Sequence, residues 1–257
     1  MGVSAGAASL AAAPVPLASS TSPIPSASPL HKHRVVFIDL ARAVAVVLML
    51  YGHTVSTVLA PEYKTGAWFD AWTFQRGLTS SLFLLLSGFA FSIATARHWT
   101  QHLRPGARLV RRLRRFAFFV VLGYALHFPV ARLADLSGIS DDRWRSFLVV
   151  DVLQLIGVTF MGVQLLVLCV RSRRLFAAAV FALAALVVAA TPAMWAVDWT
   201  LVAPRAVAAY LTPHGGSLFP MFPWSAFILA GAGLGQLYAR WGAANLEAYS
   251  IRVLLVP

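Results

Sequence analysis

Six long apolar runs occupy most of this 257-residue chain, and they leave few folds open to it. Each run has roughly the length that a helix needs to cross a bilayer, about 20 residues. Inside lipid, only helices and closed barrels satisfy every backbone hydrogen bond. We therefore predict an all-α, polytopic transmembrane helix bundle with about six spans, over residues 35–59, 79–96, 116–131, 147–170, 175–197 and 218–239.

The composition agrees with a membrane protein and excludes several other classes. Hydrophobic residues make up 59% of the chain and charged residues 12%, whereas soluble domains average about 45–50% and about 25%. Disorder over most of the chain is excluded, because disorder requires low hydrophobicity. The single cysteine, Cys169, excludes a disulfide framework.

A net charge of +12 is also found in proteins that bind nucleic acids. Here, however, many of the basic residues are clustered in the short segments between the apolar runs. Seven of the 21 Lys and Arg residues fall within residues 97–115, and three more fall within residues 171–174. Such clusters are typical of the cytoplasmic loops of membrane proteins. We therefore expect the lipid bilayer as a partner of this chain and no nucleic acid.

The same clusters predict an orientation. If both lie in the cytoplasm together with the flank at Lys32 and Arg34, the N-terminus is cytoplasmic as well. The loops left outside then carry six of the nine acidic residues and few basic ones; these loops are 60–78, 135–146 and 198–217. We predict an integral protein of a bacterial-type cytoplasmic (inner) membrane.

The two ends of the chain differ from its middle. Residues 1–33 are rich in Ala, Ser and Pro, which predicts a disordered cytoplasmic tail; a wrongly assigned start codon is the alternative. Residues 34–257 are predicted to form the membrane domain. The final stretch, SIRVLLVP, resembles the opening of a seventh helix. Either the chain is a C-terminally truncated fragment, or this last segment is too short to span.

The first apolar run contains three polar residues, Asp39, Arg42 and His53, and such residues are costly inside a membrane. At 100° per residue, His53 lies about 20° from Arg42 around the helix, and Asp39 lies about 40° from His53. All three share one stripe, with about 16 Å of rise between Arg42 and His53. In one interpretation, Arg42 reaches the headgroups, Asp39 pairs with it and His53 is interfacial. In the other, the stripe faces a polar cavity, where Arg42 meets an anionic group and His53 acts as a base.

Three more polar residues are expected at the depth of His53. His127 lies about 16 Å along a helix that starts at the beginning of the third run. Asp151 and Gln154 are expected one to two turns into the fourth run, on one face of the helix. A carboxylate near an imidazole would orient the ring and favour its role as a base. The alternatives are that Asp151 caps a helix start and that His127 is hydrogen-bonded in the bundle or exposed.

Other residues have plainer interpretations. The spacing of Gly231 and Gly235 predicts close packing between membrane helices. Trp224 is expected at the membrane interface and, with Gln154, on the substrate side. No metal site is expected, because His98 and His102 have no acidic or cysteine residue near them.

Four stretches together resemble transmembrane acyltransferases. Arg42 and His53 are separated by ten residues (Arg-x10-His) within FIDLARAVAVVLMLYGH. This opening is similar to that of acyltransferase family 3 and of the bacterial heparan-alpha-glucosaminide N-acetyltransferase-like proteins. The second run, SLFLLLSGFAFSIA, is similar to their second helix. VDVLQLIGV and FPWSAFILAGAGLGQ resemble later stretches of the heparan-alpha-glucosaminide branch, and the match covers about residues 34–240.

The resemblance implies an enzyme that takes an acyl group, usually acetyl, from cytoplasmic acyl-CoA and passes it to a hydroxyl or amine of a sugar or glycan outside the membrane. By position, His53 would be the catalytic histidine, with Asp151 or His127 as supporting groups. Arg42 and Asp39 would then lie on the donor side.

The basic loop 104–115, which contains Arg111 and Arg112, is expected to determine topology. It could also bind lipid phosphates or the 3′-phosphate of acetyl-CoA.

The chain departs from the family pattern in two ways. The animal heparan enzymes place a histidine in the loop after the first helix, whereas residues 60–78 contain none. Family members also usually have more helices. Two other functions therefore stay open: a transporter or carrier component whose polar stripe lines a substrate path, and an inactive fragment. A homodimer is left open as well.

Overall fold

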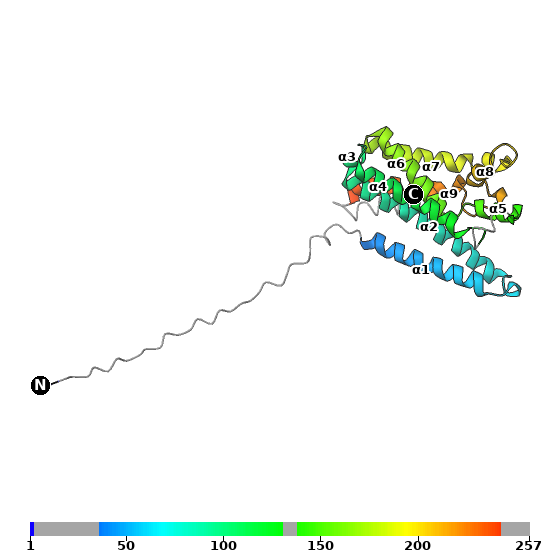
Figure 1. Ribbon diagram of the computed structural model, residues 1–257, viewed down its shortest axis with the longest axis horizontal. Helices are drawn as coiled ribbons and strands as arrows, with labels where there is room; N and C mark the ends of the chain where they lie inside the picture. The colour runs from blue at the N-terminus through cyan, green and yellow to red at the C-terminus, as the bar shows by residue number, and fades with distance from the viewer. Residues whose placement is uncertain (3–35, 131–137, 243–257) are drawn as a thin grey trace. The chain divides into compact units, whose positions relative to one another are not determined.

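The computed structural model describes residues 1–2, 36–130 and 138–242 (Figure 1). Its regular structure over these residues consists of nine α-helices with short 3₁₀ and π segments, and contains no strand. The helices beyond Val36 belong to one compact unit. The predicted all-α bundle is confirmed. Except for Met1 and Gly2, the tail predicted over residues 1–33 lies outside the described residues.

Four of the described helices are long and apolar enough to cross a membrane: Ile38–Val58, Ala67–Arg97, Val152–Val170 and Arg173–Ala196. The predicted spans at residues 116–131 and 218–239 are not among these four, because one helix carries many charges and the other is short. Helix α4 (Ala107–Leu126) begins with an arginine-rich segment, and α9 (Met221–Leu237) has only 17 residues. The orientation in the membrane stays a prediction.

Three predicted runs have boundaries close to those of the observed helices. The sequence pattern locates them well because each is apolar nearly throughout and ends at polar or proline-containing segments. The three helices are α1 (Val36–Val58), α7 (Arg173–Ala196) and α9, which continues into a π-helix over Tyr238–Gly242.

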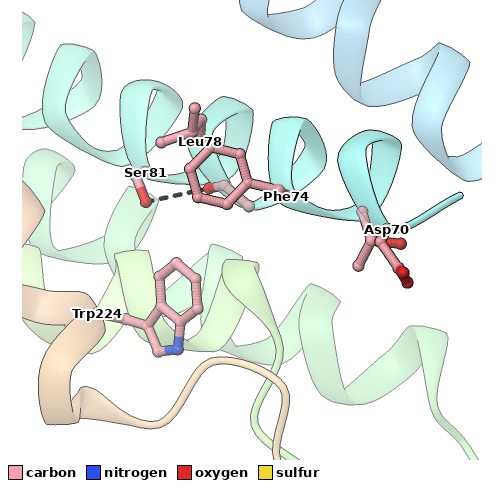
Figure 2. Close-up of a pocket in the computed structure, with 7 residues that line it drawn as sticks. Asp70, Phe74, Leu78, Ser81 and Trp224 are labelled. Carbon is pink, nitrogen blue, oxygen red and sulfur yellow. Dashed lines mark hydrogen bonds between the residues drawn. The ribbon is translucent and has the colours of Figure 1, made fainter. Parts of the chain in front are cut away.

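The second span begins earlier than predicted. Helix α2 covers Ala67–Arg97, so most of the predicted outer loop 60–78 is helical; a 3₁₀ turn at Pro61–Tyr63 precedes it. Asp70 and Arg76 break the apolar pattern of this segment without breaking the helix. The turns from Asp70 to Ser81 lie opposite Trp224 of α9 (Figure 2).

The predicted boundaries of the third span were wrong at both ends. The arginine-rich loop contains helix α3 (Trp99–His102) and the first half of α4. Helix α4 ends at Leu126, and His127 is its C-cap rather than a residue within a span. Pro129 explains this end, because a proline lacks the backbone N–H of a helix and disfavours helical backbone in the residue before it.

The fourth span is also shorter than predicted. Residues 147–148 end a separate helix, α5 (Asp141–Leu148), and α6 begins at Val152 and runs to Val170. Asp151 is the N-cap of α6, so it does not lie one to two turns inside the helix. The predicted outer loop 198–217 contains α8 (Arg205–Leu211) and a 3₁₀ turn at Pro213–Gly215. An ion pair between Arg205 and Asp141 joins α8 to α5.

Glycines bring α2 and α9 into backbone contact. A Cβ atom on Gly231 would lie 1.9 Å from the carbonyl oxygen of Leu85, and one on Gly235 would lie 2.6 Å from that of Phe89. On the α2 side, a Cβ on Gly88 would lie 2.0 Å from the carbonyl oxygen of Ile228. The predicted close packing at Gly231 and Gly235 is confirmed.

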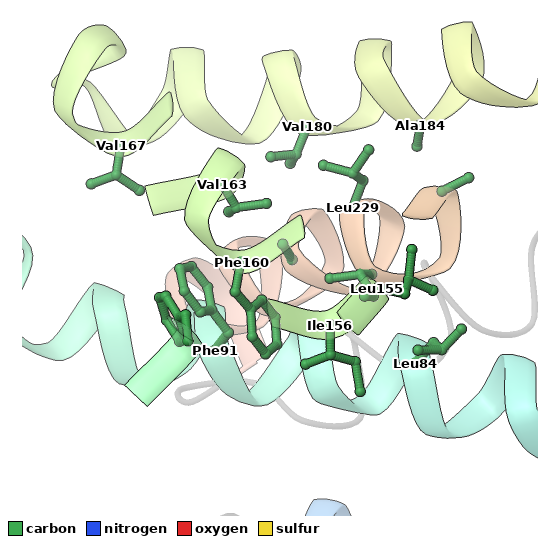
Figure 3. Packing of buried hydrophobic residues seen from close by; sticks show 14 of the residues in the cluster. Leu84, Phe91, Leu155, Ile156, Phe160, Val163, Val167, Val180, Ala184 and Leu229 are labelled. Atoms are coloured by element: carbon green, nitrogen blue, oxygen red, sulfur yellow. The ribbon is translucent and has the colours of Figure 1, made fainter. Parts of the chain in front are cut away.

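The core lies where α6 packs among α2, α7 and α9 (Figure 3). Its centre is aromatic: the ring centroid of Phe91 on α2 lies 4.9 Å from that of Phe160 on α6, and Phe116 on α4 lies 5.3 Å from Phe160. Aromatic pairs at such distances contribute about 0.5–1.5 kcal/mol each beyond the burial of their surface. This core holds α4 and α6 against the rest of the bundle.

Candidate active site

The site begins with a close approach of α4 and α6. A Cβ atom on Gly157 of α6 would lie 2.7 Å from the carbonyl oxygen of Phe116 on α4. One on Gly123 of α4 would lie 2.4 Å from the side-chain amide carbon of Gln154 on α6. The absence of side chains at these two glycines lets the end of α4 lie beside the start of α6.

The start of α6 is fixed by a reciprocal cap. The Asp151 side chain accepts the backbone N–H of Val152 at 2.6 Å, and Gln154 Oε1 accepts the backbone N–H of Asp151 at 3.3 Å. These bonds are part of a capping box, which satisfies amide groups that the first turn of a helix leaves free. Gln154 is fully buried. The carboxylate of Asp151 is therefore held in one orientation.

The chain before α6 is anchored to the segment that leads into α9. The Ser217 hydroxyl accepts the backbone N–H of Val150 at 3.1 Å, and the carbonyl oxygen of Val150 accepts the N–H of Phe219 at 3.1 Å. Both Val150 and Ser217 are buried. Asp151 is thus preceded by a residue, Val150, that is hydrogen-bonded to the segment before α9, and it is followed by the first turn of α6. Both neighbours restrict the backbone of Asp151.

His127 faces Asp151 across the approach of α4 and α6. Its Nδ1 lies 3.0 Å from the carbonyl oxygen of Gly123, and its Nε2 lies 3.9 Å from Asp151 Oδ2. A carbonyl oxygen can only accept, so Nδ1 carries the proton in this bond and Nε2 is left as the basic nitrogen. Both side chains are 32% exposed. The structure therefore brings together His127, Asp151 and Gln154, which the sequence placed at one depth.

Two tyrosines near the end of α4 were not singled out from the sequence. The hydroxyl of Tyr124, one turn before His127, donates to that of Tyr210 on α8 at 3.3 Å. Burial raises the pKa of Tyr210, so its phenol stays protonated. The i, i+3 spacing of Tyr124 and His127 was the available signal. That spacing does not predict the contact between Tyr124 and Tyr210, because Tyr210 belongs to a different helix, α8.

A groove lies between the N-terminal turns of α2 and the start of α9 (Figure 2). Its volume is about 490 Å³, within the range of small-molecule sites. Trp224, predicted on the substrate side, forms one wall. The α2 wall comes from Asp70, Thr73, Phe74, Gly77, Leu78 and Ser81. His127 and Asp151 are not among the lining residues.

The polar stripe of α1 has a different environment. Arg42 Nη2 lies 2.7 Å from Asp39 Oδ1, as the first interpretation of the stripe expected. The side chain of His53 is exposed, and its carbonyl oxygen accepts the Thr57 hydroxyl. Among the described residues, no contact joins His53 to His127 or Asp151. The roles proposed for His53, Arg42 and Asp39 stay predictions.

The two arginines predicted to bind the donor point in different directions. Arg111 is exposed. Arg112 donates to the Thr95 hydroxyl at 2.6 Å, and its guanidinium lies 4.0 Å from the ring centroid of Phe91. Burial, and next the positive charge of Arg112, lowers the pKa of His102 to about 4. Arg112 thus joins α4 to α2, and its role toward a donor stays a prediction.

The described residues contain no group of three or more His, Cys, Asp or Glu side chains placed to hold a metal ion.

Comparison with known proteins gives one clear result. The family model described as "Heparan-alpha-glucosaminide N-acetyltransferase, catalytic" matches residues 34–254. No curated protein and no solved structure matches the chain. The matched span contains every candidate residue discussed above.

Proposed function

The chain belongs to the heparan-alpha-glucosaminide N-acetyltransferase catalytic family, and we propose that it is an integral membrane acetyltransferase that uses acyl-CoA as donor and an extracytoplasmic sugar as acceptor. The apolar helices support the membrane location. The family match favours an enzyme over the transporter alternative, because it covers nearly all of the membrane domain. The acceptor group would be a hydroxyl or an amine.

The observation that carries the mechanism is the His127–Asp151 pair. In the proposed reaction, His127 Nε2 takes the proton of the acceptor hydroxyl or amine as the acceptor atom attacks the thioester carbonyl carbon. The carbon–sulfur bond then breaks, and the imidazolium of His127 gives the same proton to the thiolate of CoA, which restores the neutral base. The positive imidazolium formed in the first step lies between the carbonyl oxygen of Gly123 and the carboxylate of Asp151.

Two features of the pair suit general-base catalysis. The bond from Nδ1 to Gly123 fixes the ring and its tautomer. The 3.9 Å gap to Asp151 exceeds hydrogen-bond length, so Nε2 stays able to accept a substrate proton while the carboxylate attracts the charge that develops. A positioned base of this kind contributes about 10²–10⁴-fold in rate.

His53 is the competing candidate for the base, because it completes the Arg-x10-His pattern. Its exposed side chain lacks an orienting contact among the described residues, whereas His127 has two. We therefore assign the base to His127 and place Arg42 on the donor side. If His127 is the base, its substitution should abolish most acetyl transfer and substitution of His53 should not. If His53 is the base, the reverse should hold.

The test is transfer of labelled acetyl from acetyl-CoA by the full chain in lipid nanodiscs, with amino sugars and hydroxyl-only sugars as separate acceptors. We expect His127→Gln to lose about 10²-fold or more and His53→Gln to stay within a few-fold of the unmodified protein. His214→Gln is the matched control, since His214 is exposed. Loss confined to His53→Gln would move the base to α1, and no transfer by the unmodified protein to any sugar would reject the proposed activity.

A further inference from the structure

A second cavity lies at the opposite end of the α7–α9 pair from Trp224. It has a volume of about 460 Å³ and lies between the first turns of α7 and the end of α9. The two helices are in close contact beside it: a Cβ atom on Gly233 of α9 would lie 2.5 Å from the Phe181 ring of α7. Neither the acetyl-transfer mechanism nor the family resemblance assigns a role to this cavity.

The rim of the cavity is strongly positive. Arg173 and Arg174 from α7 and Arg240 from the π-helix after α9 line it, and none of the described residues that line it is acidic. No salt bridge to any of the three occurs among the described residues. Three guanidinium groups around one cavity favour an anion with several oxygens, and arginine binds phosphate oxygens in a two-pronged geometry.

One of the three arginines is held in place by a buried group. Arg173 Nε donates to Gln236 Oε1 at 3.3 Å, and Gln236 Nε2 donates to the carbonyl oxygen of Ser92 on α2 at 3.5 Å. Gln236 is only 3% exposed. Arg173 uses only Nε for this bond. Its two terminal nitrogens can therefore still donate hydrogen bonds to a ligand in the cavity. The rim is thus partly preorganised by the bundle.

The floor of the cavity is apolar. Ala177, Ala178 and Phe181 of α7 and Leu237 of α9 form it. Helix α7 is also one of the candidate membrane spans, and its first turns carry Arg173 and Arg174. A cationic rim at the start of a span, above an apolar floor, is suited to a ligand with a phosphate head and hydrocarbon attached. Basic pockets between membrane helices bind lipid headgroups in this way.

We propose that this cavity binds the phosphate headgroup of an anionic phospholipid, with part of an acyl chain on the floor formed by Ala177, Ala178, Phe181 and Leu237. The lipid would bridge α7 and α9 at this end of the bundle. Free CoA also carries phosphates, but its pantetheine arm is rich in amides and suits the apolar floor poorly. The proposal does not depend on the acetyl-transfer activity.

The test measures lipid binding to the purified full chain in detergent, by native mass spectrometry and by thermal unfolding. The probes are phosphatidylglycerol, phosphatidylcholine, coenzyme A and inorganic phosphate. We expect saturable binding and a raised Tm with phosphatidylglycerol, and neither effect with phosphatidylcholine or inorganic phosphate. Coenzyme A is expected to bind at the donor site of the proposed activity, with an affinity that substitutions in the rim of this cavity do not change. The double variant Arg174→Gln/Arg240→Gln should weaken phosphatidylglycerol binding at least tenfold. The matched control, Arg143→Gln/Arg145→Gln, removes two exposed arginines of α5 and should change it less than twofold.

A third variant, Ala178→Phe, distinguishes a lipid from a free phosphate compound. Ala178 is exposed at the cavity, so the larger side chain fills the floor without entering the core. We expect it to weaken phosphatidylglycerol binding severalfold. Equal losses of phosphatidylglycerol binding in the rim and control variants would overturn the proposal, and so would a loss of coenzyme A binding in the rim variant as large as its loss of phosphatidylglycerol binding. Unchanged lipid binding in Ala178→Phe would overturn it too.

Discussion

The close approach of α4 and α6 sets the distance between His127 and Asp151, so widening it should reduce catalysis. Gly157→Ala is the cleanest perturbation. The added Cβ would lie 2.7 Å from the carbonyl oxygen of Phe116, about 0.7 Å short of the 3.4 Å at which ordinary contact begins. A backbone carbonyl cannot rotate away as a side chain can, so the helices themselves must separate.

The expected effect has two parts. Overpacking of this kind costs about 1–3 kcal/mol of stability. A misplacement of about 1 Å in a catalytic geometry can reduce the rate about 10²-fold. For the smaller shift expected here, we predict a loss of about tenfold in acetyl transfer.

Gly162→Ala is the control, because it makes the same substitution in the same helix where nothing lies within 4 Å of the new Cβ. Both variants gain the same helix propensity, up to about 1 kcal/mol, so their difference isolates the contact with α4. The assays are thermal unfolding in detergent and labelled acetyl transfer in nanodiscs. Equal stability and equal activity in the two variants would refute the argument.

Three further predictions follow from other contacts. Gly231→Ala should destabilise the bundle by about 1–3 kcal/mol or more, since its Cβ would lie 1.9 Å from the Leu85 carbonyl oxygen; an unfolding midpoint equal to that of Gly162→Ala would contradict this. Because the pKa of His102 falls from 6.5 to about 4 on folding, the unfolded chain takes up a proton first as the pH falls through this window. Stability should therefore change little well above pH 6.5 and should fall as the pH drops from 6.5 toward 4, and the fall should be absent in His102→Gln unfolding curves. Asp151→Asn keeps the cap but removes the charge, so acetyl transfer should fall about tenfold or more while the unfolding midpoint changes little; a large loss of stability with normal activity per folded molecule would argue against a catalytic role.

The sequence pattern predicts the helical class and most helix positions, because apolar runs ended by charge or proline are a strong signal. It was less accurate where helices extend beyond the apolar run. Helix α2 begins at Ala67 and α4 at Ala107, in segments that carry charged residues. A charged helix turn and a charged loop have similar composition, so the boundary could not be located from hydropathy alone.

The site was partly predictable. Asp151 followed three residues later by Gln154 is a helix-start signature, and Pro129 signals the end of α4 near His127. Those two cues would have corrected the predicted start of α6 and the predicted end of α4. The inward direction of Arg112 could not have been predicted, because it depends on Thr95 and Phe91 of a different helix. Contacts between helices require the three-dimensional arrangement.

The most direct test of the central assignment is chemical rescue of a truncated base. His127→Ala removes the imidazole and leaves space beside Asp151, so added imidazole should restore a saturable part of acetyl transfer in the nanodisc assay. The same addition should have no effect on His53→Ala, which should retain most of its activity without it. A fully active His127→Ala protein, or a His53→Ala protein that is inactive and rescued by imidazole, would contradict the assignment of His127 as the general base.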